Sequence, residues 1–248
     1  MDVDELKAKV ARLEALHAEF ERKFPAMYEE TDYESLLMNV RELYSLILEK
    51  LELASALYRE LARVGGRVEG LTKEIHRNEH QMKFRLEEVL SLLSKATDYD
   101  ARIKFGTAMD RLSRFHRVYD YAVGRSLSAL DAEVEGLTLL MEGEKEKKVP
   151  PSIMDKLRKI DEIEGELEVV KRFMFRLYTQ PGDVHKVEET LKDWHSRGLL
   201  WVEARNVEKL SGVQDAGEIL EGLALIGVVE KKMRGGEGVY RHRTFSQG

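Results

Sequence analysis

The sequence predicts a mainly α-helical protein: long antiparallel helical hairpins or a coiled-coil bundle, followed by a small C-terminal α+β domain. Three observations indicate this fold class. Apolar residues recur at steps of three and four over great lengths, as in amphipathic helices. None of the four prolines interrupts a long periodic segment. Near the C-terminus, two strand-like stretches flank a glycine-rich turn, which is typical of a β-hairpin.

Apolar seams of helical spacing define the long helices. They occupy residues 3–24, 36–61, 68–93, 105–141 and 153–177. The seam from Phe105 to Met141 predicts one helix on the order of 60 Å long. The helix over 36–61 carries two adjacent seams, so we expect it to touch more than one neighbour. Seams of this length favour self-association or packing against a helix of a partner protein.

The letters TDY precede two of the long helices, beginning at Thr31 and at Thr97. Each threonine is the expected N-cap, because its hydroxyl oxygen can accept a hydrogen bond from an amide of the first turn. Glu34 completes a capping box after Thr31. Two explanations of the repetition stay open. It is either convergent capping or an ancient duplication of a helical hairpin, with Gly65 and Gly66 between the copies.

Composition limits the classes of function. The chain of 248 residues is 35% charged, carries a net charge of −6 and has no cysteine, which excludes disulfides and thiolate metal sites. Its high-charge, amide-poor composition suits a thermophile. No apolar run approaches the roughly 18 to 20 residues of a membrane span, so we expect a cytoplasmic protein without membrane contact. The negative net charge means that nucleic-acid contact requires a local basic patch.

Motifs for catalysis are nearly absent. The segment HRNEH, His76 to His80, matches the H-x-x-E-H pattern of inverted zinc peptidases, and its spacing puts both imidazoles on one helix face. No third ligand is identifiable, and the helix belongs to a bundle. His116 interrupts an apolar seam and is interpreted as a core or register-setting residue. We therefore predict a protein without enzymatic activity, and with no catalytic residue, metal, cofactor or small-molecule substrate.

The pattern changes after Pro181. A short amphipathic helix over 183–198 is followed by the extended piece LLWVEA, a second helix in ARNVEKLSG and a third over 214–226. The stretch VVEKKMRGGEGVYRHRTF then reads as two strands. This quarter of the chain resembles the winged helix-turn-helix superfamily. The resemblance is carried by VEKLSGV as second helix and turn, ILEGLALIGVVEKK as third helix and strand, and RGGEG as wing tip. The resemblance implies a fold and leaves DNA or protein open as the ligand.

Domain boundaries are expected near Pro150 and Pro181, where glycine, proline and charged residues gather. The first domain is a long-helix bundle or coiled coil. A linker with a connecting helix follows, and a winged-helix domain ends the chain. The predicted ranges are 1–148, 149–180 and 181–248.

The third helix of the C-terminal domain lacks cations, although it is the helix that reads DNA in many winged-helix proteins. Its outer face carries the candidate partner-binding residues Gln214, Asp215, Glu218 and Glu221, together with Gly217 and Gly222. Duplex DNA would repel these carboxylates. The glycines permit close approach and the acids favour a basic partner, which indicates a protein-binding surface. A solvated face without a ligand fits the same residues.

The hairpin after this helix has the opposite charge. Its candidate nucleic-acid-binding residues are Lys231, Lys232, Arg234, Arg241 and Arg243. Such a hairpin can lay its side chains along phosphates without reading sequence. A charged hairpin that merely deters edge-to-edge strand pairing is the alternative.

Two functions are compatible with these features. The first is a helical scaffold or adaptor in a DNA-linked assembly, of chromosome or transcription machinery, that binds a partner protein through its winged helix. The second is a transcription regulator that dimerises through its coiled coil and binds DNA through the winged helix. The acidic third helix favours the adaptor, and the basic hairpin keeps the regulator open.

Overall fold

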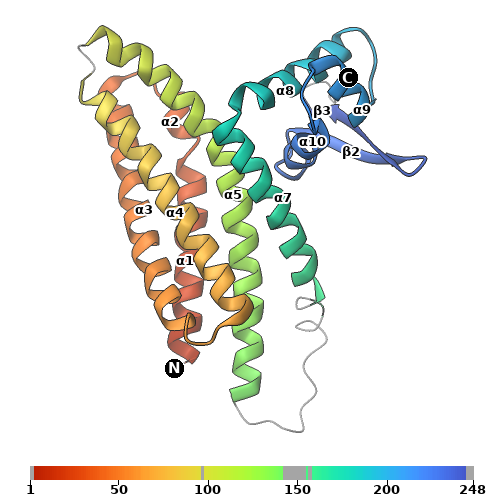
Figure 1. Ribbon diagram of the computed structural model, residues 1–248. Helices are drawn as coiled ribbons and strands as arrows, with labels where there is room; N and C mark the ends of the chain where they lie inside the picture. Colours follow the sequence, from red (N-terminus) through yellow and green to blue (C-terminus); the bar gives the residue numbers. More distant parts are fainter. Residues whose placement is uncertain (1–2, 96–97, 142–154, 156–157, 244–248) are drawn as a thin grey trace. The chain divides into compact units, whose positions relative to one another are not determined.

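The computed structural model describes residues 3–95, 98–141, 155 and 158–243 (Figure 1). The chain divides into two compact units, Met1–Ile163 and Glu164–Gly248. The predicted fold class is confirmed: the chain is mainly α, with a small antiparallel sheet near its C-terminus. Thr97 and Pro150, on which sequence predictions were based, lie outside the described residues. None of the described helices is both long and apolar enough to cross a membrane.

The N-terminal unit is a bundle of long helices. Its elements are α1 (Val3–Lys23), α2 (Ala26–Glu29), α3 (Tyr33–Leu61), α4 (Gly66–Leu93) and α5 (Tyr99–Met141). Both α1 and α4 pack against α3 and against α5, so the four long helices form a closed ring around one core (Figure 1). The expectation that the helix with two seams touches more than one neighbour is confirmed, since α3 lies between α1 and α4.

The predicted seams form the core of this bundle. Their buried members include Leu6, Val10, Leu13, Phe20, Val40, Leu43, Ile47, Leu57, Ile75, Met82, Leu86, Leu112, Val123 and Leu130. Each fully buried side chain of this kind contributes about 1.5–3 kcal/mol relative to an exposed one. The seams alone therefore explain why these helices associate.

The start of α3 corrects one prediction. Its N-cap is Asp32, which has an extended backbone, with φ −91° and ψ 133°. The Asp32 carboxylate accepts a hydrogen bond of 2.9 Å from the amide of Ser35, and this bond lowers the pKa of Asp32. The capping role predicted for Thr31 is therefore wrong by one residue. Both residue types cap well, but the carboxylate also carries a negative charge that the positive end of the helix dipole favours.

The turn between α3 and α4 depends on two glycines. Gly65 and Gly66 have φ of 73° and 66°, in the left-handed region that other residues rarely adopt. They end the short connection that follows Leu61, and α4 then runs back along α3 (Figure 1). The two glycines therefore lie within one helical hairpin, which α3 and α4 form.

The C-terminal unit combines short helices with the sheet. Its elements are α7 (Ile160–Thr179), from Glu164 onward, then α8 (Pro181–Ser196), β1 (Val202–Glu203), α9 (Ala204–Ser211), α10 (Ala216–Leu225), β2 (Val229–Arg234) and β3 (Glu237–His242). The strand order is β1-β3-β2 and both pairings are antiparallel. Gly235 and Gly236, with positive φ, close the β2–β3 hairpin, as predicted. The order of elements after Pro181 is the predicted one.

The core of this unit is small. Its buried residues come from every helix and strand of the unit, and include Val170, Phe173, Val187, Leu191, Val202, Val207, Ile219, Leu220, Leu223, Val229 and Val239. His195 lies at the end of α8: its Nδ1 is 2.7 Å from the carbonyl oxygen of Leu199, and its Nε2 accepts a hydrogen bond of 2.8 Å from the backbone amide of His242 on β3. The first contact holds the chain that leaves α8, and the second connects the end of α8 to the end of β3.

Candidate functional site

The acidic residues predicted on the outer face of α10 lie beside α7 of the same unit. Arg176 on α7 donates from Nε to Glu218 at 3.3 Å and from Nη2 to Asp215 at 3.3 Å. It also donates from Nη1 to the backbone oxygen of Gln214 at 3.2 Å. Arg172, one turn earlier, lies 3.7 Å from the other oxygen of Glu218. This acidic face therefore has two intramolecular guanidinium partners.

Gly222 provides the apolar part of the same contact. A Cβ at this position would lie 2.2 Å from Cγ of Phe173 on α7, so only glycine fits there. The Phe173 side chain is fully buried. Gly217, the other glycine of the predicted face, has its nearest neighbour, the Cβ of Ala204, at an ordinary 3.7 Å. The close approach that was predicted at these glycines is made within the unit, at Gly222.

Glu221 faces the hairpin instead of α7. It accepts hydrogen bonds of 2.6 Å from Lys231 Nζ and from the hydroxyl of Tyr240. Burial, and next the bond to Glu221, raises the pKa of Tyr240. The four predicted partner-binding residues are thus divided: Glu221 joins α10 to the sheet, and the other three lie beside α7.

Two of the predicted basic residues of the hairpin lie over an aromatic ring for which the sequence predicted no role. Lys232 Nζ lies 3.9 Å from the ring centroid of Trp201, and the guanidinium of Arg241 lies 4.9 Å from it. Arg241 also forms an ion pair of 2.5 Å with Glu230 on the adjacent strand. Arg234 is exposed at the hairpin end of β2. A tryptophan within the predicted extended piece LLWVEA was the signal for this arrangement.

Arg243 lies apart from this group. One of its guanidinium nitrogens is 3.2 Å from the position that a Cβ on Gly227 would occupy, where the chain leaves α10. Lys231 pairs with Glu221. The structure therefore brings Lys232 and Arg241 together over one ring, and distributes the remaining predicted cations along the hairpin and its base.

A fully buried polar network crosses the centre of the helical bundle. Lys50 on α3, Glu79 on α4 and Tyr119 on α5 are each 0% exposed. Lys50 Nζ lies 2.9 Å from Glu79 Oε1, 3.1 Å from Nδ1 of His17 on α1, and within hydrogen-bond reach of the Tyr119 hydroxyl. That hydroxyl donates to Glu79 Oε2 at 2.9 Å. Each of the four long helices thus contributes one side chain.

Burial governs the electrostatics of this network. It lowers the pKa of Lys50, while Glu79 acts in the opposite direction. It also raises the pKa of Tyr119, and Glu79 adds to that effect. The Lys50 ammonium lies 4.8 Å from the ring centroid of Tyr119 and 5.1 Å from that of Phe20. An enclosed ion pair of this kind needs all its hydrogen bonds to offset the loss of hydration.

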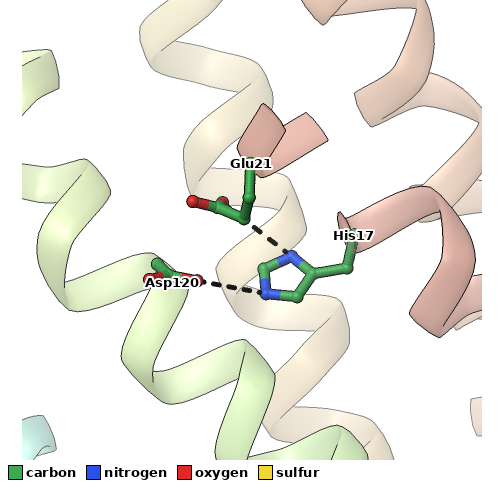
Figure 2. Close-up of side chains that lie close together, drawn as sticks. All are labelled: His17, Glu21 and Asp120. Carbon is green, nitrogen blue, oxygen red and sulfur yellow. Dashed lines mark ion pairs between the residues drawn. The ribbon is translucent and has the colours of Figure 1, made fainter. Parts of the chain in front are cut away.

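A second cluster lies beside this network, between α1 and α5, and includes His17, Glu21 and Asp120 (Figure 2). His17 Nε2 lies 3.5 Å from Asp120 Oδ1, and His17 Nδ1 lies 4.0 Å from Glu21 Oε1. His116 Nε2 is 2.8 Å from Glu21 Oε2. The His116 ring stacks on Phe24 with centroids 3.5 Å apart. His116 therefore packs in the bundle and also faces a carboxylate.

Sequence reasoning missed Lys50, Glu79 and His17, although a signal was present. Each occupies a position where an apolar seam should continue: His17 between Leu13 and Phe20, Lys50 between Ile47 and Ala54, and Glu79 between Ile75 and Met82. Polar residues on several seams, at positions that pack together, indicate a buried network.

The HRNEH segment does not form a zinc site of the peptidase type. Glu79 points into the bundle, whereas His76 is half-buried and His80 is exposed. The His76 and His80 rings lie 5.0 Å apart in an edge-to-face arrangement. Among the described residues, the group whose donor atoms converge as metal ligands is His17, Glu21 and Asp120.

A pocket of about 580 Å³ opens where the start of α3 and the end of α4 meet the start of α5. Its lining is mainly apolar and includes Tyr33, Leu36 and Phe105. The Tyr33 hydroxyl donates to the carbonyl oxygen of Leu93 at 2.7 Å, which joins the two helix ends beside the pocket. Comparisons with family models, with curated proteins and with solved structures found no match.

Proposed function

We propose that the protein is a non-enzymatic helical adaptor in a DNA-linked assembly, and that its C-terminal unit is a winged helix that binds a partner protein. The observation that carries this proposal is the environment of α10. On its outer face, Phe173 packs against Gly222. The carboxylate of Glu218 forms ion pairs with Arg172 and Arg176. These contacts within the unit show which chemistry the face of α10 accommodates, namely an aromatic ring flanked by guanidinium groups, and a partner segment of that chemistry would suit its exposed part.

The same contacts weigh against groove reading by α10. The major groove of DNA is about 12 Å wide and admits a helix only when its outer face is uncovered. Here α7 covers part of that face, and the side chains beside it are carboxylates, which phosphates repel. No lysine or arginine lies on α10 itself. Phosphate contact, if it occurs, would come from the hairpin.

The chemistry of α7 defines the expected partner. Arg172 and Arg176 are four residues apart and lie beside the aromatic Phe173. Asp215 and Glu218 keep 62% and 42% of their side-chain surface exposed, so they can accept further basic groups. Exposed ion pairs contribute only about 0.2–1 kcal/mol each. We therefore expect a partner segment that combines arginines or lysines with an apolar or aromatic anchor.

The second candidate is the DNA-binding regulator that dimerises through its helices. The observation that favours it is the pair of hairpin cations Lys232 and Arg241 over the Trp201 ring, with the exposed Arg234 at the hairpin end of β2. These side chains would bind phosphates without sequence preference. Alanine at Lys232 and Arg234 would then flatten the salt dependence of DNA binding, by about one unit of logarithmic slope for each phosphate that is no longer bound.

The adaptor is tested by charge reversal at Asp215 and Glu218. Glu221 is left intact because it bonds Tyr240 and Lys231. The Asp215→Lys, Glu218→Lys double variant should lose protein capture from nuclease-treated native lysate. A double variant with the same charge change at two other exposed acids, Glu189→Lys with Glu208→Lys, should retain it.

DNA binding separates the two candidates. Fluorescence anisotropy with duplex DNA at two salt concentrations measures affinity and sequence preference. The adaptor proposal expects weak, sequence-independent binding that charge reversal on α10 leaves unchanged or strengthens. It fails if the protein binds one DNA sequence specifically and the Asp215→Lys, Glu218→Lys variant loses that specificity while it remains folded, because α10 would then be reading bases.

A further inference from the structure

Two histidine–carboxylate pairs face each other between α1 and α5. His17 and Glu21 are four residues apart on α1, and His116 and Asp120 are four residues apart on α5. This spacing places both members of a pair on one face of a helix. Because α1 packs against α5, the two faces meet (Figure 2). Four groups of the types that bind transition metals are thus collected by two rigid helices.

Their distances approach those of a coordination shell. One donor atom from each of His17, Glu21 and Asp120 lies within 4.8 Å of the other two. Ligands at about 2.0–2.2 Å from a tetrahedral zinc ion lie roughly 3.3–3.6 Å from one another. The 3.5 Å between His17 Nε2 and Asp120 Oδ1 already falls in that range. Rotation of the Glu21 side chain would bring the third donor to a common centre.

Several of these atoms are buried and poorly satisfied by their neighbours. Within the described part of the chain, His17 Nε2, Glu21 Oε1 and His116 Nε2 make no hydrogen bond of good geometry, although His116 Nε2 lies 2.8 Å from Glu21 Oε2 and His17 Nε2 lies 3.5 Å from Asp120 Oδ1. The His17 residue is only 8% exposed. A buried polar atom left unsatisfied costs about 1–3 kcal/mol, so such atoms call for an explanation. A bound cation would satisfy all three donors at once.

We propose that His17, Glu21, Asp120 and His116 bind one divalent transition-metal ion of the zinc type. The donor set of two imidazoles and two carboxylates suits zinc, cobalt or ferrous iron. Magnesium and calcium prefer oxygen ligands throughout and do not fit it. The two carboxylates also neutralise the charge of the ion, which makes it acceptable in a half-buried position. The sequence had predicted no metal, and this site departs from that prediction.

The surroundings fit a resident ion. Asp120 exposes 53% of its side chain, whereas His17 exposes 10%, so an ion would enter from the Asp120 side. The stacked Phe24 ring holds His116 in place. The Lys50 ammonium donates to His17 Nδ1 at 3.1 Å and holds the ring in place, so a metal ion at Nε2 would displace the proton that this nitrogen carries. The network at the centre of the bundle would then orient the first ligand.

The test is a titration of the chelator-treated, untagged full chain with Co²⁺, whose visible absorption reports the coordination number. His76 and His80, an i, i+4 pair on α4, are a second place where Co²⁺ would bind. The titration therefore uses the His76→Ala, His80→Ala background. We expect one Co²⁺ per chain, displaced by one equivalent of Zn²⁺, with an absorption spectrum of four- or five-coordinate cobalt.

Substitution of the ligands completes the test. Asp120→Asn and Glu21→Gln should each weaken Co²⁺ binding by tenfold or more. Glu19→Gln, at a half-exposed acid on the same helix as Glu21, should not. Circular dichroism verifies that each variant is folded. We expect Asp120→Asn to fold because the side chain is half-exposed and the amide has the same shape as the carboxylate. The site is excluded if the His76→Ala, His80→Ala background binds no Co²⁺, or if both ligand variants bind it as tightly as that background. The outcome is independent of the partner-binding proposal.

Discussion

The two units of this protein use charged residues in opposite ways. In the bundle, Lys50 and Glu79 form an ion pair with no exposed surface, joined by Tyr119 and His17. In the C-terminal unit, the ion pairs of Arg176 with Asp215 and Glu218 lie at the surface around a fully buried aromatic contact. In the bundle the charged groups are buried inside the packed core. In the C-terminal unit they lie outside a packed apolar contact.

This difference predicts different sensitivities. An enclosed ion pair costs hydration and is stable only while every partner remains, so the bundle should respond strongly to the loss of one charge. Exposed ion pairs are screened by solvent and contribute little. The C-terminal unit should respond instead to a change of shape where α7 meets α10. Both tryptophans, Trp194 and Trp201, lie in the C-terminal unit, so their fluorescence reports it alone. Far-UV circular dichroism mainly reports the long helices.

The largest effect is expected from Lys50→Met. This change leaves the Glu79 carboxylate buried without its counter-charge, which typically costs about 3–5 kcal/mol of unfolding free energy. Urea denaturation followed by circular dichroism measures it. Arg12→Met removes an ion pair between α1 and α3 that is exposed at both ends, and should cost less than about 1 kcal/mol.

The double variant Lys50→Met, Glu79→Gln sharpens this result. It removes both charges and leaves an amide that can still bond the Tyr119 hydroxyl, so most of the stability should return. If Lys50→Met costs no more than Arg12→Met, the buried ion pair is not what distinguishes the bundle, and the comparison between the two units breaks down.

The next effect is expected at Gly222. Gly222→Ala places a methyl group 2.2 Å from Cγ of Phe173, so α7 must shift away from α10. Overpacking of this kind costs about 1–3 kcal/mol. Gly217→Ala on the same helix meets nothing closer than 3.7 Å and should be neutral or stabilising, because alanine favours the helix. Tryptophan fluorescence during urea denaturation compares them, and equal stabilities would show that shape is not critical at this contact.

The smallest effect concerns pH and His242. Burial lowers the pKa of this histidine, and Glu188 partly opposes the shift. The unfolded chain therefore takes up a proton below about pH 6.5 that the folded unit resists. Stability of the C-terminal unit should be fully present above that pH and decline as the pH falls toward the lower folded pKa. Tryptophan-detected denaturation between pH 7.5 and 5 measures the slope, which His242→Asn should reduce; an unchanged slope would contradict the assignment.

Much of the fold could be predicted because helices and hairpins have sequence patterns that involve only neighbouring residues. Seams at steps of three and four identified α1, α3, α4 and α5, and the glycine pair at 235 and 236 identified the hairpin. The cap at Asp32 was missed by one residue because two neighbouring residues can each cap a helix. The sign of the charge on α10 and on the hairpin could also be predicted, since it depends only on which residues each element contains.

What the sequence by itself determined is the set of elements, their apolar faces and the sign of each charged surface, because these follow from residue type and spacing along one helix or strand. Which charges meet was decided only by the tertiary structure. Arg176 and Glu218 are 42 residues apart, and Lys50 and Tyr119 are 69 apart. Periodicity within an element does not encode such pairings. They arise when four seams close around one core or when α7 lies beside α10, so the metal-type cluster and the occupied face of α10 became visible only in three dimensions.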